Sequence, residues 1–123
     1  MSDERFPTAW AGRTAVVTAE REIDLTNAEG LGDALLSALN AGAAGLVVDM
    51  TMTAFIDSAG VTALVRASRR AAVSDAAVRL AVTAPPVLRV LNLVGIDRLI
   101  EVHPSVTAAQ ASLPDQSDHG LRA

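Results

Sequence analysis

The stretch LVVDMTMTAFIDSAGVTALVRASRRAA, residues 46–72, decides the fold that this chain adopts. It opens on an uninterrupted apolar run, Leu46–Val48, which is typical of a β-strand buried on both faces, and Asp49 ends the run with a charge. Apolar residues at helical spacing begin at Val61 and continue to Ala72. The segment therefore predicts a buried strand, a short connection and a helix.

Ser58 lies where the connection meets this helix. Asp57 and Ser58 both suit the N-cap position, because their side-chain oxygens can accept a hydrogen bond from an amide two or three residues further on. The same position also suits an anion, since free amides and the positive end of the helix dipole point towards it. A cap is the more frequent role for such a serine, by about two to one, and a phosphorylated Ser58 is the alternative.

The N-terminal part of the chain predicts a hairpin and a helix. Phe6–Trp10 and Thr14–Thr18 are β-favouring runs, and the glycine between them suits a tight turn. Thr26 and Glu29 have the T-x-x-E spacing of a capping box at the start of a helix. The apolar face of that helix holds Leu31, Leu35, Ala38 and Leu39, and Gly42 and Gly45 mark its exit.

The C-terminal half continues the alternation of strand and helix. Val78–Val82 predicts a strand by its alternating side chains. Pro85 and Pro86 begin a helix, where a missing amide costs little, and Gly95 ends it. The apolar stripe of this helix consists of Val87, Val90, Leu91 and Val94.

The last predicted elements are a strand over Leu99–Val102 and a helix within Pro104–Leu113, with Val106 and Ala109 facing inward. Strands that alternate with helices pair in parallel, because parallel neighbours need a crossover connection. The N-terminal hairpin adds an antiparallel pair. We therefore predict a layered α/β domain with a mixed, mainly parallel sheet.

Composition limits the function classes. The 123 residues predict one domain, 1–123, with a core at about residues 6–112 and a polar tail at 113–123. The net charge of -4 and a sequence pI near 5.0 argue against nucleic-acid or anionic-membrane partners. The chain has no cysteine, and we expect neither a metal nor a cofactor. It has no apolar run of about 20 residues and begins on charged residues, which predicts a cytoplasmic protein.

The pattern D-M-T-M-T-A-F-I-D-S-A-G-V-T-A-L, residues 49–64, resembles a segment of the STAS domain and of its single-domain members, the bacterial anti-sigma factor antagonists. The matching positions are Asp49, Thr51, Phe55, Ile56, Asp57, Ser58, Gly60 and Leu64. Ala59 departs from the pattern, because the family usually has Ser or Thr there.

The resemblance extends over about residues 14–112. Glu22, Ile23, Asp24 and Ala28 resemble an acidic loop of the family, although Arg21 replaces the usual glycine. The third-helix pattern of the family is matched by Val87, Arg89, Leu91 and Gly95. The resemblance implies that the helices lie largely on one side of the sheet.

The resemblance also implies a function. The unphosphorylated chain would bind an anti-sigma factor that is also a serine kinase, and phosphorylation of Ser58 would end the binding, so the chain would regulate transcription indirectly in a stress response. The implied partner-binding residues are Asp24, Asp57, Ala59, Gly60 and Thr62. A serine phosphatase that restores Ser58 is a further candidate partner. The chain is then a substrate and a binding partner, and not an enzyme. A solvated loop residue before the helix is an equally frequent role for Asp24.

Three alternatives compete with this hypothesis. In a receiver-like switch, Asp49 or Asp57 would accept the phosphoryl group. The receiver family needs a lysine on a later strand for this chemistry, and the chain has no lysine. A hydrolase with Ser58 as nucleophile needs an adjacent base, and the sequence places no carboxylate beside His103 or His119. The third alternative is a STAS scaffold or sensor subunit of a larger stress-signalling assembly. The family also occurs in anion transporters, which the lack of a membrane segment argues against.

Overall fold

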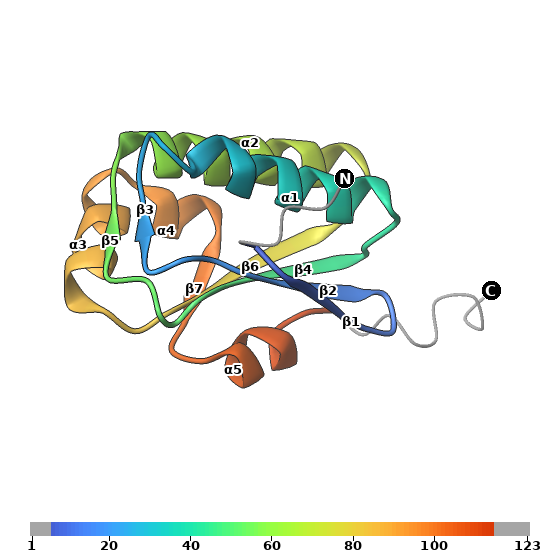
Figure 1. Cartoon of the computed structure of the whole chain (residues 1–123). Coiled ribbons are helices and arrows are strands. Elements are labelled where there is room, and N and C mark those ends of the chain that lie inside the picture. The colour runs from blue at the N-terminus through green and yellow to red at the C-terminus, as the bar shows by residue number, and fades with distance from the viewer. Residues whose placement is uncertain (1–5, 115–123) are drawn as a thin grey trace.

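The computed structural model describes residues 6–114 and shows a mixed α/β fold (Figure 1). Its larger sheet has the order β1-β2-β4-β6-β7, with β1 antiparallel to β2 and the other neighbours parallel, and its smaller sheet pairs β3 with β5 in parallel. The strands are β1 (Thr8–Ala11), β2 (Thr14–Thr18), β3 (Glu22–Ile23), β4 (Gly45–Met50), β5 (Phe55–Ile56), β6 (Ala77–Val82) and β7 (Glu101–His103). The helices are α1 (Ala28–Asn40), α2 (Ser58–Val73), α3 (Pro85–Leu93), α4 (Ile96–Leu99) and α5 (Val106–Ala111). The predicted fold class is confirmed.

The two faces of the larger sheet are covered unequally. Leu46 and Val48 of β4 point into the main core, which α1, α2, α3 and α4 cover. Val47 points to the opposite face, because side chains alternate along a strand, and there it packs with Ala81 and with Ala109 of α5. Figure 1 shows α1 and α2 above the sheet and α5 below it. The helices thus lie largely on one side, and β4 is buried on both faces as its apolar run predicted.

The hairpin prediction is also confirmed. β1 and β2 pair with Trp10 opposite Ala15 and Ala11 opposite Thr14, which leaves a two-residue turn of Gly12 and Arg13. Gly12 has a φ of 60°, and glycine adopts this region without the steric cost that other residues meet.

The predicted capping box at the start of α1 is wrong. The helix begins at Ala28, and its N-cap residue is Asn27, whose side chain makes no cap hydrogen bond. The Thr26 hydroxyl donates to the Asp24 carboxylate, and the Asn27 side-chain oxygen accepts from the Asp24 amide at 2.9 Å. Thr26 therefore lies in the turn one residue before the N-cap, so the T-x-x-E spacing of Thr26 and Glu29 does not coincide with the N-cap and N3 positions. The predicted apolar face of α1 is buried throughout.

Three predicted boundaries also need correction. Asp49 does not end its strand, since β4 continues to the buried Met50; the Asp49 carboxylate is held by the amide and hydroxyl of Thr51. Leu99 belongs to the four-residue helix α4, which is too short to show a periodicity, and the last strand is Glu101–His103. Val94 is exposed because it lies beyond the last turn of α3.

His103 has a carboxylate partner that sequence reasoning missed. Its Nε2 atom lies 3.1 Å from Oε1 of Glu101, two residues earlier on the same side of β7. Arg79 of β6 lies 3.3 Å from the same Glu101 oxygen and donates to the Ser112 hydroxyl at 2.9 Å. These contacts join α5 to the sheet. The other histidine, His119, and residues 115–123 of the predicted tail lie outside the described residues.

We expect amide hydrogen exchange to be slowest at Leu46–Val48 in β4 and at Val78–Val82 in β6. Both strands are paired on two sides and carry the core, so their amides should open only with global unfolding. NMR exchange rates test this, with the edge strand β7 as the internal comparison. Exchange in β4 as fast as in β7 would contradict the layered core.

Candidate functional site

Ser58 is the first residue of α2. It directly follows Asp57, and the segment that carries Asp57 lies beside the loop that carries Asp24. β5 pairs in parallel with β3, with Ile56 beside Ile23. The pairing continues by one hydrogen bond, because the Asp57 amide donates to the Ile23 carbonyl at 3.0 Å. The residues that follow each strand, Asp24 and Asp57, therefore emerge side by side. This brings together the two acidic positions that the resemblance implied for one site.

The N-cap of α2 is Asp57 and not Ser58. The Asp57 carboxylate accepts hydrogen bonds from the amides of Ala59 at 2.9 Å and Gly60 at 3.3 Å. Ser58 is exposed, and its hydroxyl has no hydrogen-bond partner within residues 6–114. Thr62, one turn further on, is exposed as well and donates its hydroxyl to the Ser58 carbonyl at 3.0 Å. The Ser58 hydroxyl is thus free for chemistry, but the amides of Ala59 and Gly60 are already neutralised by a carboxylate.

Asp24 adds a second negative charge to this corner. Its carboxylate accepts from the hydroxyl and the amide of Thr26. The hydroxyl hydrogen bond is the main reason that the pKa of Asp24 lies below its ordinary value; amide hydrogen bonds from Thr26 and Asn27 act in the same direction, and partial burial opposes them. Asp24 is therefore ionised at neutral pH.

Gly60 fixes how closely α2 approaches the β3–β5 pair. It is buried, and a Cβ atom there would lie 2.6 Å from Cγ1 of Ile56 and 2.7 Å from Cγ2 of Ile23. Ala59 is half-buried against the core. Of the predicted partner-binding residues, Thr62 is exposed and Asp24, Asp57 and Ala59 are partly exposed, whereas Gly60 is buried and has a packing role.

Two buried polar residues that sequence reasoning missed, Asn27 and Thr53, support the loops of the site. The buried Asn27 donates to Oε1 of Glu20 at 2.8 Å and to the carbonyl of Glu22 at 2.7 Å. The buried Thr53 donates its hydroxyl to the Glu20 carbonyl at 2.8 Å. Asn27 could have been found from its place four residues before Leu31, where a residue faces the core. Nothing local marks Thr53, because its acceptor is 33 residues away.

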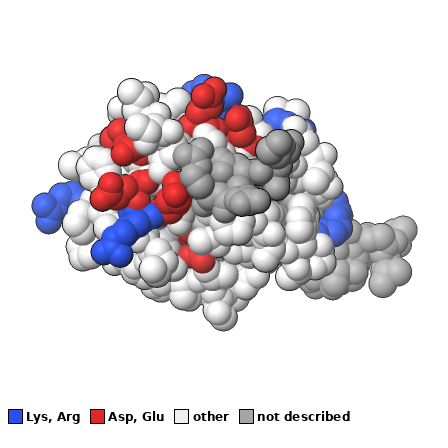
Figure 2. Space-filling view, viewed as in Figure 1, with Lys and Arg blue, Asp and Glu red and all other residues white. Residues whose placement is uncertain are grey.

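Apolar side chains lie exposed beside the acidic corner. Leu25 is 81% exposed and Phe55 49% exposed, and they adjoin Asp24 and Ile56 respectively. Figure 2 shows acidic side chains grouped on the side of the molecule where β3 lies in Figure 1, with arginine side chains next to them. The surface around Ser58 therefore combines exposed apolar area with negative charge.

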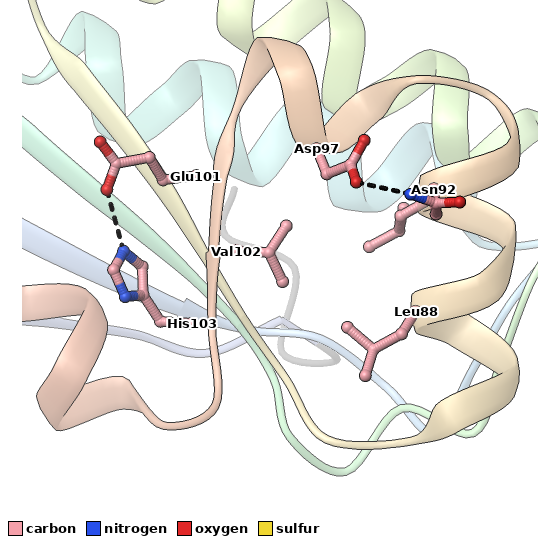
Figure 3. A pocket seen from close by; sticks show the side chains of 7 residues that line it. Leu88, Asn92, Asp97, Glu101, Val102 and His103 are labelled. Atoms are coloured by element: carbon pink, nitrogen blue, oxygen red, sulfur yellow. Dashed lines mark hydrogen bonds and ion pairs between the residues drawn. The ribbon is translucent and has the colours of Figure 1, made fainter.

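A separate groove of about 520 Å³ crosses the edge strand β7. Figure 3 shows Val102 pointing towards α3, whereas Glu101 and His103 lie on the other side of the strand. His103 shares its sheet face with Ala81 and α5, and α2 lies on the opposite face. The Glu101–His103 pair therefore cannot serve Ser58 as a base. Among the described residues, no group of three or more His, Asp or Glu side chains is placed to hold a metal ion.

A family model for the STAS domain matches residues 7–109 of this sequence. The chain belongs to the STAS domain family. Its fold is similar to the crystal structure of an anti-sigma factor antagonist from Mycobacterium paratuberculosis, with 20% sequence identity and a TM-score of 0.82 over 94% of this chain and 100% of that chain. No curated protein matches the sequence.

The STAS domain also shares its fold with the anti-sigma factor antagonist SpoIIAA. The unphosphorylated form has a TM-score of 0.73 and 20% identity over 86% of this chain and 94% of that chain. The phosphorylated form, from Bacillus, has a TM-score of 0.67 and 18% identity over 86% and 97%. No helix within residues 6–114 of this STAS domain is long and apolar enough to cross a membrane.

Gly60→Ala should destabilise the domain by about 1–3 kcal/mol, because the added methyl group would overlap Ile23 and Ile56. Gly32→Ala in α1 is the matched control, since its Cβ would meet only Cβ of Ala63 at an ordinary 3.6 Å. Denaturant unfolding of both variants measures the difference. Equal stabilities would show that α2 can shift away from the β3–β5 pair.

Thr26→Val should raise the pKa of Asp24 towards its ordinary value, because it removes the hydroxyl donor and keeps the backbone amide. A lowered folded-state pKa stabilises the fold above the unfolded pKa, and this contribution is lost as the pH falls through the folded pKa. The variant should therefore lose less stability on acidification. NMR titration of the Asp24 carboxyl measures the shift, and Thr51→Val, which acts on Asp49, should leave it unchanged.

Proposed function

We propose that this STAS domain is an anti-sigma factor antagonist of the cytoplasm. In its unphosphorylated form it binds an anti-sigma factor that is also a serine kinase and so frees a sigma factor for transcription, and phosphorylation of Ser58 ends the binding. A serine phosphatase resets the switch. The observation that carries the proposal is that Ser58 presents a free, exposed hydroxyl at the start of α2 while Asp57 provides the helix cap.

The division of roles between Asp57 and Ser58 suits a modification site. A kinase needs access to the hydroxyl, and a capping serine would have to give up its hydrogen bond to be phosphorylated. Here the cap hydrogen bonds come from Asp57, so modification of Ser58 removes no contact from the start of α2. The fold can therefore stay the same in both states.

The effect of the phosphate follows from the charges already present. A phosphoserine adds about -1.5 to -2 charges at pH 7. The amides of Ala59 and Gly60 do not compensate it, because the Asp57 carboxylate occupies them. The phosphate therefore stays in solvent beside Asp57 and Asp24, where it adds repulsion and bulk to the binding surface.

The surface around Ser58 also indicates what the partner offers. Leu25 and Phe55 supply apolar area, which is the main source of association free energy. Phosphorylation lowers the affinity where the partner places acidic or closely packed groups opposite Ser58, because a cationic group there would attract the added phosphate. Phosphorylation brings more charge to the same place without changing the apolar contacts.

With the kinase that copurifies from the native host and ATP, phosphate should be found on Ser58 and should be absent from Ser58→Ala. The unmodified domain should bind the kinase at least about tenfold more tightly than the phosphorylated domain, a difference of about 1.4 kcal/mol. The stability of the domain should change by no more than about 1 kcal/mol. Peptide mass mapping, calorimetric binding and thermal unfolding measure the three quantities.

Thr62→Ala is the control for this experiment, because Thr62 is the next exposed hydroxyl on the same stripe of α2. It should accept phosphate on Ser58 as the parent chain does. Phosphate on Thr62 in the parent chain would refute the site. Unchanged affinity, or unfolding on phosphorylation, would refute the electrostatic mechanism even with Ser58 as the site.

A further inference from the structure

The larger sheet has two edge strands that differ in their protection. Exposed edges pair with other strands unless they are very short or carry charge or proline. β7 has three residues, includes Glu101 and is followed by Pro104. β1 contains no charged residue, and all four of its residues are exposed. Within residues 6–114, β1 has no neighbour on the side away from β2.

The hydrogen bonds of the hairpin show which groups β1 offers at its free edge. The Thr18 amide donates to the Pro7 carbonyl at 2.9 Å, so Pro7 faces β2. Residues of an antiparallel pair alternate between bonding to the partner strand and pointing away from it. Ala9 therefore bonds to β2 as Pro7 does, and the N–H and C=O groups of Thr8 and Trp10 point outward.

Trp10 adds apolar area next to these backbone groups. It lies opposite Ala15, a residue of the main core, and so it is on the face of the sheet that α1 and α2 cover. Its side chain is 47% exposed, and within residues 6–114 no further strand lies beside it. A strand added at this edge would cover Trp10 and bond to the outward groups.

We propose that β1 pairs with β1 of a second copy of this chain in an antiparallel, two-fold symmetric dimer. The register places Ala9 opposite Ala9 of the second copy and Thr8 opposite Trp10 of the second copy. In this register Thr8 and Trp10 exchange all of their outward amide and carbonyl bonds, and the two Ala9 side chains occupy the close, non-hydrogen-bonded position. A two-fold axis perpendicular to the sheet keeps Trp10 on the helix-covered face, beside a threonine methyl group.

A second copy fits this edge better than the other occupants. The strand is self-complementary, and two-fold dimers are the commonest soluble oligomers. β1 itself brings no charge to the contact, so two chains of net charge -4 do not place like charges opposite each other there. Two four-residue strands bury less than the roughly 800 Å² per partner of a stable interface, so the dimer depends on concentration. Figure 1 places the start of α2 at a different end of the molecule, so Ser58 stays open in both copies.

Single cysteines test the register, because the chain has no cysteine of its own. Ala9→Cys should form an intermolecular disulfide under mild oxidation, since the two Cβ atoms meet across the axis at a distance that a disulfide spans. Ala11→Cys is the matched control on the same side of β1. It lies opposite residue 7 of the second copy and should crosslink far more slowly. Equal crosslinking of the two variants would overturn the proposed register.

Thr8→Pro tests the edge itself by sedimentation equilibrium. Its amide points outward, so proline removes a donor from the dimer and none from the hairpin, and the melting temperature should stay unchanged. The parent chain should pass from monomer to dimer between low micromolar and millimolar concentration, and Thr8→Pro should remain monomeric. A parent chain that stays monomeric, or a Thr8→Pro chain that still dimerises, would overturn the proposal. Protection of the Thr8 and Trp10 amides that does not depend on concentration would also overturn it, since the edge would then be covered within one chain.

Discussion

The short parallel pairing of β3 with β5 determines the geometry of the whole candidate site. Each strand has two residues, yet their pairing places the loop after β3 beside the start of α2. The hydrogen bond from the Asp57 amide to the Ile23 carbonyl extends the pairing up to the helix. Gly60 then lets the first turn of α2 rest directly on Ile23 and Ile56, because any side chain there would push the helix away. Without the β3–β5 pairing, the two acidic loops would not share one surface.

The proposed switch would act through the charges of this corner. The N-cap of α2 is the Asp57 carboxylate. The amides of Ala59 and Gly60 already donate to it, so they are not available to a phosphate on Ser58. A phosphate added next to it meets negative charge from Asp57 and Asp24 in place of free amides. In the proposed mechanism the domain would keep its fold after phosphorylation, and a partner that contacts the corner would sense the added charge.

Much of the fold could be predicted from local patterns. The apolar run Leu46–Val48 predicted a strand buried on both faces because the central strands of a parallel sheet are covered on both sides and read as continuous apolar runs. The buried face of α1 followed from its helical spacing, and the prolines marked the start of α3. The capping box failed because α1 begins one residue later than the T-x-x-E spacing requires, with Asn27 as its N-cap. The helix α4 was missed because a single turn has no period to detect.

By itself the sequence determined the order of the longer strands and helices, the parallel core and the segment that carries Ser58, because these depend on spacing along the chain. It did not reveal the two-residue strands β3 and β5 or the single-turn helix α4, which are too short to show a period. Only the tertiary structure decided the division of roles at the site. It assigned the cap to Asp57, placed Asp24 beside it, buried Asn27 and Thr53 under the loops, and left Ser58 free. These facts depend on contacts between residues that are distant in the chain, such as Thr53 with Glu20. Such contacts are decided by packing in three dimensions, which no local pattern records.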